Sequence, residues 1–267
     1  MSDPLPEISF ETLRKSHAIW EPIVRHWFRS EVRHMERIPA TGPNLFVAHH
    51  DGGVLPINGI CFGVAWHKHF RFERGLYVLI HDLIYKTFAP FTDLLPRSGC
   101  VPADRATMDA IVPTGTDMLV FPGAARETFR TFWERKQIDL GGRMGFIRQA
   151  MKHELPIVPV VSAGSHETLI VLRRGARLAK WLRLRSIVRS ADALPIMAGL
   201  PWGLWALPFL PQLPLPAKIT TEVLEPIILT GDSSDVTAVK RGFDHVLETM
   251  QGALDRLYAE RRYPFLG

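Results

Sequence analysis

The amino-acid sequence predicts an α/β fold, with a mostly parallel central sheet flanked by helices and an N-terminal amphipathic helical segment. From residue 40 onward, short apolar runs alternate with amphipathic stretches. This alternation is typical of strand-helix-strand units, in which the strands pair in parallel. An amphipathic, aromatic-rich stretch precedes them. We therefore expect an N-terminal helical segment at 1–39 and one α/β domain at 40–267.

Residues 11–37 are expected to form a helix with an apolar stripe on one side and an arginine ladder on the other. The stripe consists of Leu13, Trp20, Val24, Trp27, Phe28 and Met35. The ladder consists of Arg25, Arg29 and Arg33. A basic helix of this kind either packs on its own domain or lies in a bilayer interface.

The domain that follows is expected to contain five strands and five helices. The expected strands are 44–48, 76–80, 99–102, 117–122 and 156–161. The expected helices are 54–66, 81–95, 106–113, 143–153 and 236–260. In parallel sheets, ligand sites gather at the carboxyl ends of the strands, so the residues that follow each strand are the candidates for function.

Composition and charge narrow the function classes. The chain has 267 residues, of which 46% are apolar and 22% charged, which excludes disorder as its main state. A net charge of +5 is typical of proteins whose partners carry phosphate, such as nucleic acid, anionic lipid or small phosphorylated molecules. Two cysteines, Cys61 and Cys100, exclude a disulfide scaffold and a cysteine-rich zinc site. The first ten residues lack the pattern of a signal peptide.

Two adjoining segments suggest a lipid-facing surface. Residues 173–189 carry seven basic side chains and no acidic one, and residues 193–217 carry no charge but six prolines. So many prolines oppose a membrane-spanning helix. We expect the basic side chains to lie at the lipid headgroups, beside an apolar surface that faces the membrane without spanning it. The alternative is a solvated helix and a loop packed on the core.

A histidine cluster follows the first expected strand. His49, His50 and Asp51 precede Gly52 and Gly53. Imidazole titrates near neutral pH, so a histidine here is a candidate general base. The glycines allow a substrate to approach the backbone closely. The alternative is a polar turn with a capping role.

A second candidate half-site follows the strand at 117–122. It contains Phe121, Pro122, Gly123, Arg126 and Glu127. Arg126 is a candidate for binding phosphate, and Glu127 for orienting a histidine or accepting a hydroxyl group. On its own, an Arg-Glu pair in a loop is usually a surface pair.

Other chemistries find less support. His67, His69, His81 and Asp82 lack a recognised metal-ligand spacing, so no metal is expected. Ser165 and His166 suggest a serine hydrolase, but the sequence has no GxSxG elbow, and neighbouring side chains do not easily face each other. A nucleic-acid-binding protein ranks last, because the aromatic residues follow apolar periodicity.

Taken together, four blocks resemble the glycerolipid acyltransferase superfamily with its PlsC-like fold, over about residues 40–230. The blocks are FVAHHDGG at 46–53, GCVPADRA at 99–106, VFPGAARET at 120–128 and IVPVV at 157–161. The HHDG and PGAARET stretches are similar to the divergent branch that contains diacylglycerol acyltransferases. The usual His-x4-Asp block is absent, because the fifth positions are Val54 and Leu55. Asp51, Glu127 and Asn58 therefore remain alternative partners of the histidine.

The resemblance implies a membrane-associated acyltransferase. Acyl-CoA or acyl carrier protein would donate a fatty acyl group to a hydroxyl of a lysophospholipid or other glycerolipid, without a cofactor, as in phospholipid biosynthesis. His50 would be the base, Arg105 would contact an acceptor phosphate, Pro159 would line the acyl channel, and backbone amides or Arg126 would stabilise the oxyanion. Peripheral or monotopic association at the cytoplasmic face is expected, with no nucleic acid. The alternative is a non-catalytic lipid-binding protein on the same fold.

Overall fold

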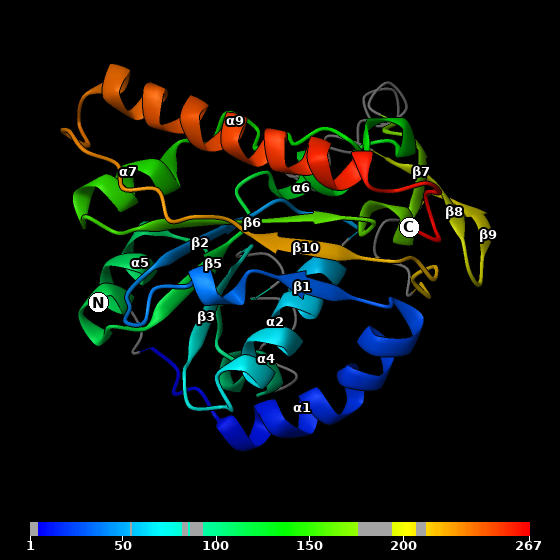
Figure 1. Cartoon of the computed structure of the whole chain (residues 1–267), viewed down its shortest axis with the longest axis horizontal. Helices are drawn as coiled ribbons and strands as arrows, with labels where there is room; N and C mark the ends of the chain where they lie inside the picture. The colour runs from blue at the N-terminus through cyan, green and yellow to red at the C-terminus, as the bar shows by residue number, and fades with distance from the viewer. Residues whose placement is uncertain (1–4, 54, 82–84, 86–92, 176–193, 207–211) are drawn as a thin grey trace.

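The structure is a computed structural model, and it describes residues 5–53, 55–81, 85, 93–175, 194–206 and 212–267 (Figure 1). A seven-stranded sheet forms its centre. The strand order is β1 (Glu31–Arg33), β10 (Thr220–Val223), β6 (Ile157–Ala163), β2 (Leu45–Ala48), β5 (Asp117–Val120), β3 (Leu76–Ile80), β4 (Cys100–Pro102). Every neighbouring pair is parallel except β10 with β6. The predicted α/β class and mostly parallel sheet are confirmed.

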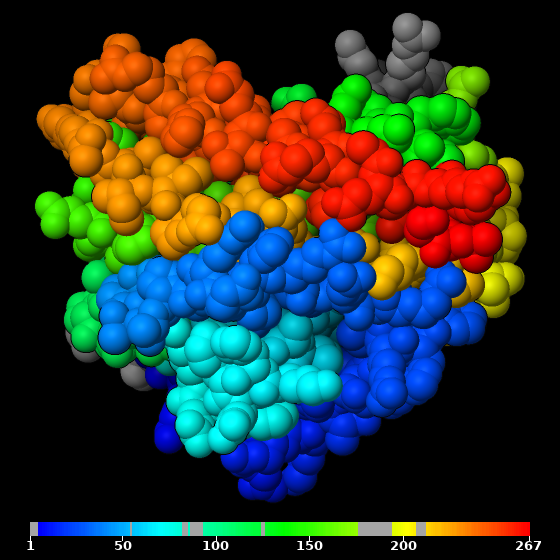
Figure 2. All heavy atoms as spheres, in the orientation of Figure 1, coloured from blue at the N-terminus to red at the C-terminus, as the bar shows by residue number. Residues whose placement is uncertain are grey.

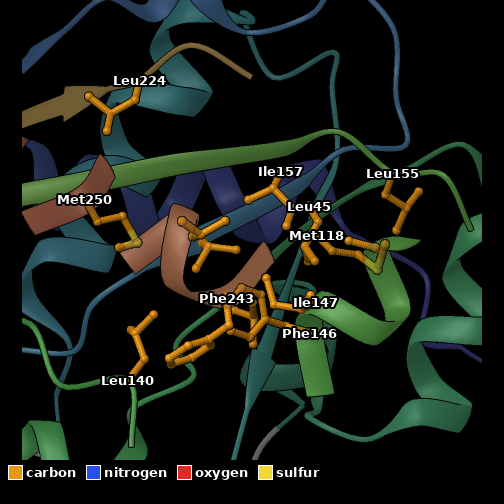
Figure 3. Packing of buried hydrophobic residues seen from close by; sticks show 14 of the residues in the cluster. Leu45, Met118, Leu140, Phe146, Ile147, Leu155, Ile157, Leu224, Phe243 and Met250 are labelled. Atoms are coloured by element: carbon orange, nitrogen blue, oxygen red, sulfur yellow. The ribbon is translucent and has the colours of Figure 1, made fainter. Parts of the chain in front are cut away.

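Helices cover both faces of the sheet because side chains alternate along the central strands. Leu45 and Val47 of β2 belong to the core shared with α5 (Arg105–Ile111), α7 (Gly145–Lys152) and α9 (Val236–Ala259). Figure 3 shows part of this core, where Leu45 and Ile157 lie near Phe243 and Ile147.

Phe46 and Ala48 of the same strand point to the other face of the sheet. They pack in a second core with Phe62 and Trp66 of α2 (Ile57–His69). On this side α1 (Phe10–Pro22) contacts α2 and α4 (Leu94–Arg97). The sheet is therefore covered on both faces, as the near-continuous apolar runs in the sequence predict.

The expected N-terminal helix is only partly present. Ser9 caps α1 by accepting a hydrogen bond from the Thr12 backbone N–H, and a π-helical turn, η1 (Ile23–Trp27), continues it. The expectation of helix is wrong for residues 31–33, which form strand β1 and pair in register with Thr220–Glu222 of β10. Backbone pairing with a distant strand has overridden the local helical pattern.

A small antiparallel sheet, which the sequence analysis does not predict, lies beside the main one. It consists of β7 (Ile170–Arg173), β8 (Ile196–Gly199) and β9 (Gly203–Trp205). Val171, Met197 and Trp205 form a core cluster on one of its faces. Most of the basic segment at 173–189, and most of the expected helix at 81–95, lie outside the described residues.

The strand expected at 76–80 has the expected bounds, and the other expected helices and strands are present with shifted ends. The short elements not yet named are η2 (Met35–Arg37), η4 (Val112–Thr114), α6 (Ala124–Thr128), η5 (Phe132–Glu134) and η6 (His166–Thr168). None of the helices in the described part of the chain is both long and apolar enough to cross a membrane.

A buried aspartate ties together the amino-terminal ends of the central strands. Asp117 accepts hydrogen bonds from the backbone N–H and side-chain amide of Asn44, at 3.0 and 2.8 Å, and from Nε of Arg74 at 2.6 Å. We expect Asp117→Ala to lower the free energy of unfolding by about 3 kcal/mol, since it leaves these donors without an acceptor.

Urea denaturation checks this expectation. Asp244→Ala is the control, because Asp244 forms a solvent-exposed pair with Lys240 and its loss is expected to change stability by about 0.5 kcal/mol or less. Equal effects of the two substitutions would contradict the role assigned to Asp117.

Candidate active site

Three loops meet at the carboxyl ends of β2, β5 and β6. These strands are neighbours and run parallel, so residues 49–53, 121–127 and 164–168 emerge at one edge of the sheet. The backbone N–H of His50 donates a hydrogen bond of 2.8 Å to Oε2 of Glu127. The two half-sites suggested by the sequence therefore lie in direct contact.

His49 is enclosed by the protein. Its Nε2 accepts a hydrogen bond of 2.9 Å from the backbone N–H of Ser162, and its Nδ1 lies 3.0 Å from Oδ2 of Asp51. Burial is the largest single influence on the pKa of this ring and lowers it, but the charge and hydrogen bond of Asp51 together with the charge of Glu127 make the net shift upward. Protonation of Nε2 would deprive the Ser162 N–H of its acceptor, so the ring holds its proton on Nδ1. His49 thus joins the end of β2 to β6.

His50 is the more open of the two histidines. Its ring is partly exposed and meets Phe121 edge to face, with ring centroids 5.5 Å apart. Its Nδ1 is buried and has no hydrogen-bond partner among the described residues. Burial lowers the pKa of His50 to about 4, and the charges of His49 and Arg130 contribute to the shift. At neutral pH the ring is therefore uncharged and keeps the lone pair that a general base needs.

Asp51 is the centre of a buried polar network that faces away from solvent. Its Oδ1 accepts from Nη2 of Arg130 at 2.5 Å, and its Oδ2 accepts from Oγ of Ser165 at 2.7 Å. Nδ1 of His166 lies 3.5 Å from Oδ1. Burial opposes ionisation, but His49 and Arg130 hold the pKa of Asp51 well below its usual range. The Asp51 carboxylate therefore contacts His49 and, through Ser165, holds the loop after β6.

Glu127 holds the backbone at His50. Besides accepting from the His50 N–H, it accepts from the Asp139 N–H at 3.3 Å and lies 3.7 Å from Nη1 of Arg130. Burial raises the pKa of Glu127 to about 7, although Arg130 and His49 oppose the shift. Gly123 is necessary here, because a Cβ at that position would collide with the Glu127 carboxylate.

The loop after His50 is shaped by two glycines and an asparagine. Gly52 and Gly53 have φ values of 80° and 88°, a region that favours glycine. A Cβ on Gly52 would lie 2.6 Å from Oγ1 of Thr168. Asn58 is buried in the first turn of α2, and its amide donates a hydrogen bond of 2.6 Å to the His49 carbonyl. Asn58 thus attaches the backbone at His49 to the first turn of α2.

The remaining candidates lie further from this network. Arg126 has a side chain that is 64% exposed and pairs with Asp139 at 3.3 Å. Arg105 is exposed at the start of α5, which follows β4 at the far edge of the sheet. Pro159 is buried in β6, in register with Val47 of β2. Pro122 is buried beside Gly123.

Sequence reasoning missed Arg130 and the role of the β6 loop. Arg130 lies three residues after Glu127, a helical spacing that brings side chains together, and this was the available signal. Ser165 and His166 do not face each other as a hydrolase pair would. The Ser165 hydroxyl donates to Asp51, while Nε2 of His166 contacts the Thr131 carbonyl at 3.1 Å.

Comparison with known proteins finds similarity along most of the chain. The family model for diacylglycerol acyltransferase matches residues 11–262. An uncharacterized protein of Mycobacterium leprae is 30% identical over 260 residues, which cover 94% of this chain and 67% of that protein. A bovine protein named DGAT1/2-independent enzyme synthesizing storage lipids is 29% identical over 166 residues, covering 61% of this chain and 47% of that protein.

Among solved structures, the chain is similar to the 1-acyl-sn-glycerophosphate acyltransferase PlsC of Thermotoga maritima. The TM-score is 0.54 with 14% sequence identity, and the match covers 93% of this chain and 81% of that one. This likeness confirms the predicted PlsC-like fold.

The buried Glu127 gives the site a measurable pH dependence. Its pKa of about 7 in the folded protein exceeds the ordinary value of 4.5 for a glutamate side chain, so the folded state binds more protons between these values. The contribution of Glu127 to the free energy of unfolding is therefore expected to fall by about 2 kcal/mol as pH rises from about 5 to about 8. In Glu127→Gln this loss is absent.

Denaturation of both proteins across this pH range tests the expectation. The unfolding free energy of the wild type minus that of Glu127→Gln should fall by about 2 kcal/mol as pH rises from about 5 to about 8. Glu248→Gln, at an exposed position of α9, should follow the wild type. A constant difference between wild type and Glu127→Gln would show that Glu127 does not titrate in this range.

Proposed function

Since the chain belongs to the diacylglycerol acyltransferase family, we propose that it transfers a fatty acyl group from an acyl thioester to a hydroxyl group of a glycerolipid. The observation that carries the proposal is His50, a neutral and partly exposed imidazole at the carboxyl end of β2, whose backbone is held by Glu127. Acyl-CoA or acyl carrier protein would supply the thioester, and a lysophospholipid or another glycerolipid would accept the acyl group.

His50 is proposed to act as the general base. Its free ring nitrogen removes the proton from the acceptor hydroxyl as the oxygen attacks the thioester carbonyl. The new C–O bond forms, the tetrahedral intermediate collapses, and the C–S bond breaks. The thiolate leaves and takes up the proton that His50 holds. The transfer therefore needs no acyl-enzyme intermediate.

The other site residues would position this base and its substrates. Glu127 and Asp51 fix the loop from inside the protein. Backbone N–H groups of the loop or Arg126 would stabilise the oxyanion, and Gly52 and Gly53 leave space for the substrate beside the backbone. Arg105 would meet a phosphate on the acceptor. We also propose that the protein associates peripherally or monotopically with a membrane, in keeping with its net charge of +5.

A non-catalytic lipid-binding protein is the second candidate, and one observation favours it. Nδ1 of His50 has no carboxylate partner among the described residues, whereas the Asp51 carboxylate lies against His49. A base without an orienting acid is a weaker catalyst. Such a protein would bind acyl chains but would not release thiol from acyl-CoA.

We expect His50→Ala to lower acyl transfer by about 100-fold or more, because the variant lacks the base. The measurement is thiol release from long-chain acyl-CoA with lysophospholipids, glycerol 3-phosphate, monoacylglycerol and diacylglycerol as acceptors. His245→Ala, at an exposed position of α9, is the control and should retain wild-type turnover.

Thermal unfolding of His50→Ala must match that of the wild type for the comparison to hold. Wild-type turnover in a folded His50→Ala variant would refute the base assignment. Lipid binding without thiol release from any acceptor would favour the second candidate.

A further inference from the structure

Exposed apolar side chains gather at one edge of the molecule. In the hairpin of β8 and β9 and the segment that follows it, Leu204 is 65% exposed, Leu213 61%, Trp202 50% and Leu200 49%. Ile23 and Trp27 of η1 are also exposed. We call these six residues the apolar rim. In Figure 2 the yellow hairpin and the blue N-terminal helix reach the same edge.

Hydrogen bonds connect the three parts of the chain that carry the rim. The Leu213 N–H donates a hydrogen bond of 3.0 Å to the Leu200 carbonyl, so the segment at 212–216 lies against the hairpin. Nε1 of Trp27 donates a hydrogen bond of 2.8 Å to the Pro214 carbonyl, which attaches η1 to the same segment. Three parts of the chain, distant in sequence, therefore contribute to the rim.

The rim borders the candidate active site. Leu213 follows Gln212, whose amide contacts the Gly52 carbonyl at 3.4 Å, two residues from His50. The Leu215 N–H donates to the carbonyl of Thr168, which packs against the same glycine. An object that covered the rim would therefore lie next to the loop that carries His50.

Exposed cations lie close to the rim. Residues 194–206 and 212–217 contain no charged side chain. Arg25 is exposed between Ile23 and Trp27, and Arg173 is exposed at the end of β7, beside β8. An apolar surface bordered by cations complements an anionic bilayer, with acyl chains below and phosphate groups at the border.

We propose that the apolar rim docks on an anionic lipid bilayer and holds the loop carrying His50 against the membrane surface. This inference rests on the proposed function, because a long-chain donor and a lipid acceptor both reside in the bilayer. It adds which surface faces the membrane. Docking through the rim would let both substrates reach His50 without crossing a layer of water.

Co-sedimentation of the full chain with vesicles tests the proposal. The vesicles contain phosphatidylcholine alone or phosphatidylcholine with phosphatidylglycerol. We expect the wild type to bind the anionic vesicles, and Leu204→Asp and Leu213→Asp each to lower the partition coefficient about tenfold, because each removes a leucine from the apolar contact and adds a negative charge.

Ile228→Asp is the matched control and should bind as the wild type does. Ile228 is 61% exposed, and it belongs to the segment before α9, which Figure 1 places at the opposite end of the molecule from β8 and β9. Thermal unfolding of each variant verifies that it is folded.

Two outcomes would overturn the proposal. One is wild-type vesicle binding by folded Leu204→Asp and Leu213→Asp. The other is a wild-type dimer that these substitutions dissociate without any change in vesicle binding, which would make the rim a contact between two copies of this chain.

Different variants test the proposed function and the proposed docking surface. Leu204→Asp should retain thiol release with detergent-dispersed substrates, while His50→Ala should retain vesicle binding. Acyl transfer that persists in His50→Ala would refute the role of the base and leave the vesicle result intact.

Discussion

The burial of two carboxylates against one guanidinium is the interaction on which the site depends. Asp51 and Glu127 come from different loops, and both lie within ion-pair distance of Arg130. All three residues are at most 1% exposed. Each buried ion costs several kcal/mol of solvation, so the group is stable only when it is assembled with its hydrogen bonds. The loops after β2 and β5 are thereby fixed to each other, and Ser165 adds the loop after β6.

This constraint explains why two adjacent histidines have different environments. In an extended chain, successive side chains point to opposite sides, and residues two apart share a side. His49 and Asp51 therefore point together into the buried network, where His49 meets the Ser162 N–H. His50, between them, points towards Phe121 and partly towards solvent. The network holds the backbone on both sides of His50 and leaves its ring accessible.

The same reasoning shows what could be predicted from the sequence. The central strands are fully buried runs, so their composition reveals them, and parallel pairing then brings His50 and Glu127 to one edge. Strand β1 contains Glu31 and Arg33 and owes its conformation to distant β10, which no local pattern indicates. The hydrogen bonds that join Asp51 to Arg130 and to Ser165 span 79 and 114 residues, so no local sequence pattern predicts them either. The sequence left Asp51, Glu127 and Asn58 open as partners of His50, whereas in the structure the Asp51 carboxylate lies against His49.

The location of the exposed apolar residues bears on the chemistry as well as on docking. Other exposed apolar residues on the described surface, such as Trp133, Ile228 and Leu266, are of the kind that any folded protein has. The rim instead combines η1, the β8–β9 hairpin and the following segment beside the loop of His50. A bilayer at this position would exclude water from the base. Water competes with a lipid hydroxyl for the thioester, so its exclusion favours acyl transfer over hydrolysis. Burial keeps His50 neutral but disfavours the imidazolium that forms when it accepts a proton, and the nearby charge of Asp51 favours that protonated form.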